Sequence, residues 1–198
     1  SKEIENSMVD ALNNGEFIVY FQPKYSLSDY QIIGAEALVR WDNPQKGLIP
    51  PIEFIPVFER NGFIVNIDFY VFEEVCKKIR EWMDEGQKVV PISVNLSRMH
   101  FVNSNFIEKF KLIVDKYKIP TRLIELELTE TAVLDNIEGL LDTMNNLKEK
   151  GFVISMDDFG TGYSSLNLLK ELPVDILKLD RAFFTEKDES NNEKIVIS

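Results

Sequence analysis

The sequence contains a single cysteine and a single histidine among its 198 residues. One cysteine cannot form a disulfide within the chain, and one cysteine with one histidine cannot complete a zinc site of the Cys/His type. Cys76 lies on an apolar helical stripe with Phe72 and Ile79, so we expect it in the core. We interpret His100, which follows a predicted strand, as a structural or surface residue.

Basic residues are also in short supply. The chain has 22 lysines and arginines against 33 aspartates and glutamates, which gives a net charge of −11. Phosphate backbones and anionic membranes are bound mainly by Lys and Arg, so this balance argues against a general binder of either. We therefore expect no DNA or RNA partner and no direct membrane contact from this segment.

Long apolar runs, a signal-peptide pattern, internal repeats and low-complexity linkers are missing as well. We expect a cytoplasmic protein, or the cytosolic part of a membrane-anchored signalling protein. A chain of this length suits one large domain or two small ones and can bury a substantial core.

What is present is a regular order of predicted strands and helices. We predict strands at residues 17–25, 31–41, 89–96, 123–128, 153–157 and 176–179. We predict helices at residues 4–12, 53–60, 66–85, 105–117, 138–150 and 165–171, and the first turns of another at 193–198. Residues 43–51 are predicted to form a loop. From the third strand onward the two types alternate, which indicates parallel strands joined by crossover helices.

The pattern within these strands favours a barrel over a doubly wound sheet. Ser93 and Asn95 share one face of their strand, and Glu125 and Glu127 share one face of the next, each opposite an apolar face. A doubly wound sheet has helices on both faces and favours almost continuously apolar strands. We therefore predict an α/β barrel with an apolar outer face and a polar inner face.

Two adjacent aspartates end the fifth predicted strand. Asp157 and Asp158 follow an apolar run, and Gly160 and Gly162 permit a tight turn after them. Two carboxylates held this close repel each other unless a cation lies between them. Taken alone, the motif could equally be an Asp-rich turn that caps a helix.

Several other predicted strands end in similar chemistry, and the carboxyl ends of barrel strands converge on one mouth. The side chains gathered there would be Glu36, Asn95, Glu127, Asp157, Asp158 and Lys178. Carboxylate and amide oxygens are the ligands that Mg²⁺ or Mn²⁺ prefers, and this many carboxylates favours two ions. Such a pair can hold a phosphodiester and lower the pKa of a bridging water. Salt bridges or helix caps remain the alternative for each residue taken singly.

With these residues and their neighbouring motifs, the sequence resembles a known family, the EAL phosphodiesterases that hydrolyse cyclic di-GMP. The signature Glu36-Ala37-Leu38 lies within residues 35–41, and related motifs follow at residues 21–23, 94–97, 127–130, 157–166, 172–175 and 177–180. The resemblance covers essentially all 198 residues. It implies a single EAL phosphodiesterase domain over residues 1–198, folded as a modified TIM (β/α)8 barrel whose first strand is antiparallel to the others.

The resemblance also implies a metal site. The expected ligands are Glu36, Asn95, Glu127 and Asp157, with Asp158 on the second metal ion. Lys178 is expected near the attacking water, so that Lys178, Glu36 and Asp157 form the expected catalytic set.

Other implied roles concern substrate and assembly. Arg40 matches a contact to the substrate phosphate, and Gln22 matches a residue near the nucleotide. Glu130 matches a glutamate that steadies the loop at residues 157–166. In the family this loop takes part in metal binding and in dimerisation, so we expect a homodimer.

Two departures from the family pattern stand out. Lys24 occupies a position that is usually aliphatic. In addition, family members continue beyond the equivalent of Ser198 with the last two strands, a further metal-binding glutamate and a glutamine near the substrate. We therefore expect a C-terminally incomplete barrel, impaired in catalysis by itself, whose open edges another chain or further residues cover.

The leading functional hypothesis is a metal-dependent hydrolysis of cyclic di-GMP to linear pGpG, which would lower this second messenger in bacterial signalling. The alternative is a non-catalytic EAL module that binds cyclic di-GMP or docks a partner. The signature residues present within this chain favour the enzyme. A kinase, suggested by Asp158-Phe159-Gly160, is disfavoured because no Gly-rich loop precedes this motif.

Overall fold

The computed structural model describes residues 2–102, 105–129, 137–159 and 172–179. Its helices are α1 (Lys2–Asn13), α2 (Pro51–Asn61), α3 (Ile64–Asp84), α4 (Phe106–Tyr117) and α6 (Ile137–Glu149). Its strands are β1 (Phe17–Tyr25), β2 (Ile32–Asn43), β3 (Gly47–Ile49), β4 (Ile92–Asn95), β5 (Ile124–Thr129), β6 (Val153–Phe159) and β7 (Ile176–Leu179). Two short 3₁₀ helices, η1 (Arg98–Val102) and η2 (Thr121–Leu123), follow β4 and precede β5.

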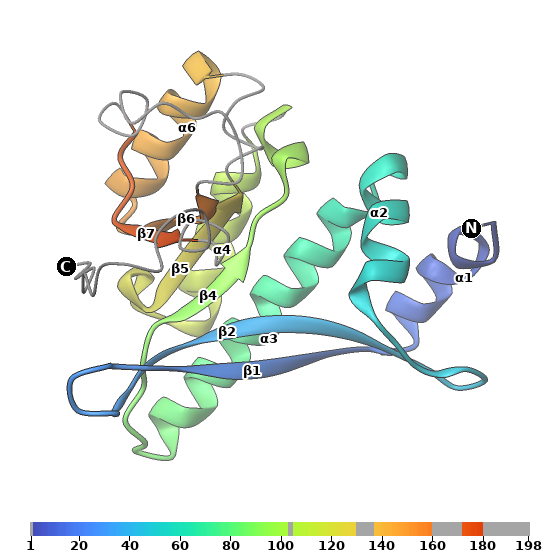
Figure 1. Ribbon diagram of the computed structural model, residues 1–198, viewed down its shortest axis with the longest axis horizontal. Helices are drawn as coiled ribbons and strands as arrows, with labels where there is room; N and C mark the ends of the chain where they lie inside the picture. The colour runs from blue at the N-terminus through green and yellow to red at the C-terminus, as the bar shows by residue number, and fades with distance from the viewer. Residues whose placement is uncertain (1, 103–104, 130–136, 160–171, 180–198) are drawn as a thin grey trace, which may run out of the picture.

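The described strands form one sheet in the order β1-β2-β4-β5-β6-β7, with β3 paired to β2. β1 is antiparallel to β2, whereas β2, β4, β5, β6 and β7 are all parallel. In Figure 1 the long β1–β2 hairpin crosses the lower part of the molecule, and the parallel strands follow from it. The predicted parallel α/β arrangement and the antiparallel first strand are both confirmed. β1 and β7 stand at opposite ends of this order, so the described strands do not close into a barrel.

The outer face of the sheet packs against helices. Ile124, Leu126 and Leu128 on β5 are buried, and α3 packs against β1, β2, β4 and α4. Between α3 and α4 the rings of Phe72 and Phe110 stack with their centroids 3.9 Å apart. Burial of this apolar face provides the main driving force for the fold.

A second part of the core lies at the start of the hairpin. Phe17, Trp41, Phe54 and Phe58 are fully buried, and their ring centroids lie 5.2 to 6.1 Å apart. The indole Nε1 of Trp41 donates a 2.8 Å hydrogen bond to Glu16, so the one polar atom of this side chain is satisfied. These contacts join α2 to the hairpin.

Two details differ from the sequence predictions, and two predicted helices are not tested. Residues 89–91 lie outside β4, which begins at Ile92 because Pro91 has no backbone N–H to donate to a neighbouring strand. The predicted loop at residues 43–51 contains β3, and the side chain of Asn43 accepts hydrogen bonds from the amides of Gln45 and Lys46 in the turn before it. The helices predicted at residues 165–171 and 193–198 lie outside the described residues.

The two rare residue types are both inside the protein. Cys76 is fully buried on α3, as predicted. His100 is only 2% exposed, which confirms its interpretation as a structural residue and rules out a surface position.

Candidate active site

The inner face of the sheet carries polar side chains that the strand register stacks in levels. Glu36 on β2 pairs with Ser93 on β4, and Ser93 pairs with Glu125 on β5. One step nearer the carboxyl ends of the strands, Asn95 pairs with Glu127. Because side chains alternate along a strand, residues two apart on neighbouring parallel strands line the same face.

The register brings together the first of the predicted ligands. Asn95 Nδ2 donates a 3.3 Å hydrogen bond to Glu36 Oε1, across β4 and β2. Gln22 lies directly opposite Glu36 on the antiparallel strand β1. Asp157 lies on β6 opposite Thr129, two residues past the partner of Glu127.

Glu127 is the most deeply buried acidic group of this set, with a side chain that is 1% exposed. Lys178 Nζ donates a hydrogen bond to its Oε2 and forms an ion pair with it. Burial raises the pKa of Glu127 to about 7 against the attraction of Lys178, and the nearby carboxylates of Glu36 and Asp157 add to the rise. Its other oxygen, Oε1, is buried and has no hydrogen-bond donor among the residues that the structure describes. Asp157 cannot fill that role while both carboxylates are ionised.

A second pair of charges, Lys24 and Glu125, lies on the same face, one level nearer the amino ends of the parallel strands than Glu127; we call it the lower pair. Lys24 Nζ donates hydrogen bonds to Ser93 Oγ at 2.9 Å and to Glu125 Oε1 at 3.2 Å. Lys178 Nζ lies 3.6 Å from the same Glu125 oxygen. Burial lowers the pKa of Lys24 against the opposing charge of Glu125. Burial would also lower the pKa of Lys178, but its contacts with Glu127 and Glu125 outweigh that effect and raise it.

Sequence reasoning missed this lower pair. Lys24 stood out only as a departure from the family pattern, and Glu125 only as a residue on the polar face. The available signal was the position of Glu125 two residues before Glu127, because a buried carboxylate needs a cation or donors nearby.

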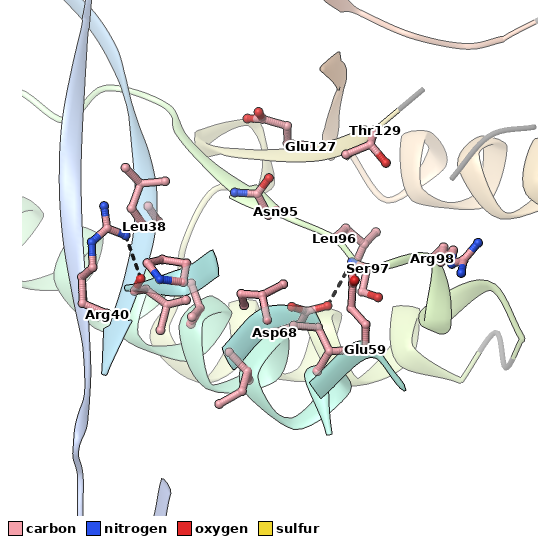
Figure 2. A pocket seen from close by; sticks show the side chains of 17 residues that line it. Leu38, Arg40, Glu59, Asp68, Asn95, Leu96, Ser97, Arg98, Glu127 and Thr129 are labelled. Carbon is pink, nitrogen blue, oxygen red and sulfur yellow. Dashed lines mark hydrogen bonds between the residues drawn. The ribbon is translucent and has the colours of Figure 1, made fainter. Parts of the chain in front are cut away.

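A pocket of about 490 Å³ opens beside Asn95 and Glu127. Figure 2 shows Leu38 and Arg40 on one wall, with Asn95 and Glu127 along the edge and Asp68 on the side formed by α3. Arg40 Nη1 donates a 2.8 Å hydrogen bond to the carbonyl oxygen of Val39. The pocket therefore combines apolar walls with a cation and carboxylate and amide oxygens, which suits a polar ligand of moderate size.

Asp68 was also missed from the sequence. Its Oδ2 accepts a 3.0 Å hydrogen bond from the backbone N–H of Ser97 and lies 2.9 Å from His100 Nε2. Asp68 therefore connects α3 by hydrogen bonds to Ser97 and His100, which follow Asn95 in the chain.

Not every predicted site residue is described. The backbone of Asp158 belongs to β6, but its side chain and all of Glu130 lie outside the described residues. Among the side chains that are described, no three or more from His, Cys, Asp and Glu are already arranged to hold a metal ion. Two of the acidic side chains are instead bound by Asn95 and Lys178. None of the described helices is long and apolar enough to cross a membrane.

Comparison with known proteins places the fold and the site in context. A family model of the EAL domain matches residues 5–198. The solved structure of the PaMucR phosphodiesterase in complex with c-di-GMP superimposes with a TM-score of 0.86 at 36% sequence identity, covering 93% of this chain and 74% of that one. The parallel α/β sheet described above is thus the fold of a solved EAL-type phosphodiesterase.

Two curated relatives extend the comparison. MucR of Pseudomonas aeruginosa, named a bifunctional diguanylate cyclase/cyclic di-GMP phosphodiesterase, is 35% identical over 196 residues, or 99% of this chain and 29% of the relative. The signaling protein YkoW of Bacillus subtilis is 38% identical over 177 residues, or 89% of this chain and 22% of the relative. The chain therefore spans less than a third of either relative. The family match, which extends over nearly the whole sequence, shows that this chain belongs to the EAL domain family.

Proposed function

We propose that the EAL domain to which these residues belong is a metal-dependent phosphodiesterase that hydrolyses cyclic di-GMP to linear pGpG. The observation that carries the proposal is the buried Oε1 of Glu127, which has no donor within the described part of the chain and lies near the carboxylates of Glu36 and Asp157. An unpaired carboxylate oxygen inside a protein is costly and is kept where a cation can bind it. Names of relatives that include cyclic di-GMP phosphodiesterase support the choice of substrate.

The donor set fits a hard divalent cation. We propose Glu36, Asn95, Glu127 and Asp157 as ligands of Mg²⁺ or Mn²⁺, and Asp158 as a ligand of a second ion. All of them offer oxygen atoms, which these ions prefer over nitrogen and sulfur. When bound, the two ions would lower the pKa of a water molecule and offset the charge of the phosphodiester.

The other residues act on the substrate. In the hydrolysis one P–O bond forms to the water oxygen and one P–O bond of the ring breaks, so that one water is consumed. Lys178 lies against Glu127 at the strand ends, where its ammonium would orient the attacking water or stabilise charge that develops on the phosphate. Arg40 in the pocket would bind a substrate phosphate, and Gln22 opposite Glu36 would lie near the nucleotide. We also propose that Glu130 steadies the loop at residues 157–166 and that the domain works as a homodimer.

The test is a hydrolysis assay with cyclic di-GMP, in which chromatography separates substrate from pGpG. Turnover should require Mn²⁺ or Mg²⁺ and stop when EDTA is added. Glu127→Gln should remove most turnover and weaken Mn²⁺ binding measured by calorimetry, because the neutral amide is a poorer ligand. Glu73→Gln, which changes a surface glutamate paired with Lys116, should alter neither. Tight binding of cyclic di-GMP without hydrolysis would reject the enzyme and favour the non-catalytic alternative.

A further inference from the structure

The lower pair of charges does more than satisfy buried groups. Glu125 has a side chain that is only 6% exposed, and one of its oxygens, Oε1, faces both Lys24 at 3.2 Å and Lys178 at 3.6 Å. Lys178 therefore lies between two carboxylates, Glu125 below and Glu127 above, and contacts Glu127 more closely. Its position depends on how strongly each carboxylate attracts it.

Lys24 changes that competition. By donating to Glu125 from β1, it neutralises a large part of the charge that would otherwise draw Lys178 downward, away from Glu127. The second hydrogen bond of Lys24, to Ser93 Oγ at 2.9 Å, holds its ammonium beside Glu125, the strand partner of Ser93. In a buried site such charge–charge contacts are far less screened than at the surface, so removing one of them has a large effect on its neighbours.

We propose that Lys24 is a positioning residue for Lys178: it occupies Glu125 and so keeps the Lys178 ammonium at the level of Glu127. The inference rests on the proposed phosphodiesterase function only for its effect on turnover. The structural part, the position of Lys178, stands on the contacts of Lys24, Ser93 and Glu125 alone.

The kinetic test combines substitutions at three positions. Lys24→Met keeps the length of the side chain and removes its charge. It should lower kcat by about 10- to 100-fold, as expected for a catalytic group displaced by about 1 Å, with less than about a twofold change in KM. Lys24→Arg should restore most of the loss. Lys116→Met removes a surface lysine paired with Glu73 and should leave kcat unchanged.

Two double variants separate positioning from general damage. In a Lys178→Ala background, Lys24→Met should cost no further turnover, because the group that it positions is gone. In a Glu125→Gln background, Lys24→Met should again cost nothing, since no carboxylate remains to draw Lys178 away. Losses that multiply in both backgrounds would overturn the proposal. If Lys24→Met alone does not fold, the comparison of Glu125→Gln with its double variant decides the question.

A crystal structure of the Lys24→Met variant without substrate provides the readout that does not depend on activity. Lys178 Nζ should move to within hydrogen-bond distance of Glu125 and leave Glu127. If Lys178 keeps its contact with Glu127 in that structure, the positioning role is wrong. If instead the wild-type protein fails to hydrolyse cyclic di-GMP, the proposed function is wrong, while the position of Lys178 in the variant still tests this inference.

Discussion

Replacing Asp68 by alanine should destabilise the protein strongly, although the residue lies outside the proposed ligand set. The side chain of Asp68 is 9% exposed and that of His100 is 1% exposed. A single oxygen of Asp68, Oδ2, faces both the Ser97 amide and the His100 ring. Alanine at position 68 would leave the buried His100 ring and the partly buried Ser97 amide without this partner.

The magnitude follows from those two contacts. Each buried group left unsatisfied costs about 1–3 kcal/mol, so the loss of two such contacts in Asp68→Ala should lower the free energy of unfolding by about 2–6 kcal/mol. For a protein of this size that corresponds to a decrease in Tm of about 4–24 °C. Because Ser97 follows Asn95 by two residues, the variant should also loosen the end of β4 and weaken Mn²⁺ binding.

Asparagine distinguishes the hydrogen bonds from the charge. Burial raises the pKa of Asp68 even though His100 and the Ser97 amide favour the ionised form, so the negative charge itself is disfavoured by folding. The carbonyl oxygen of asparagine can occupy the place of Oδ2 and accept from both groups. Asp68→Asn should therefore stay within about 1 kcal/mol of wild type.

The assay is equilibrium unfolding in urea at pH 7, followed by circular dichroism. Asp84→Ala removes an exposed partner of Arg80 and serves as the control, with an expected loss below about 1 kcal/mol. A loss below about 1 kcal/mol for Asp68→Ala, or equal losses for alanine and asparagine, would refute the reasoning.

Three further predictions test the core, the backbone and the proposed role of Lys178. Burial raises the pKa of Cys76 to about 12, so at pH 8 only about one thiol in 10⁴ is ionised and a disulfide reagent should label the protein only after unfolding. Gly151 has a φ of +86°, and a Cβ added there would lie 2.5 Å from Thr121 Oγ1, so Gly151→Ala should lower the free energy of unfolding in urea by about 2–3 kcal/mol. The control Gly86→Ala, at a φ of +71° with open space around it, should lower it by only about 1 kcal/mol. Lys178→Ala should lower kcat strongly with little change in the dissociation constant of cyclic di-GMP, and a pure loss of affinity would make Lys178 a substrate-binding residue instead.

The sequence by itself was sufficient for the parallel α/β fold and for the polar face on which the proposed site lies. In β5, apolar Ile124 and Leu126 alternate with Glu125 and Glu127, so the two kinds of side chain lie on opposite faces of the strand. This period of two is a local property of the chain and can be recognised from the sequence. The predicted gathering of polar groups at the strand ends is likewise seen in the contacts of Glu36 with Asn95 and of Glu127 with Lys178.

Only the tertiary structure decided which of these groups pair. The contact from Lys24 to Glu125 joins residues 101 positions apart, and the contact from Lys24 to Ser93 joins residues 69 positions apart. Such pairs depend on strand order and register, which local periodicity does not specify. The same holds for His100, which contacts Asp68 and Phe69 on α3 and Phe106 and Phe110 on α4. Local pattern therefore determines which face of a strand a side chain occupies, whereas its partner across that face is set by how distant strands and helices assemble.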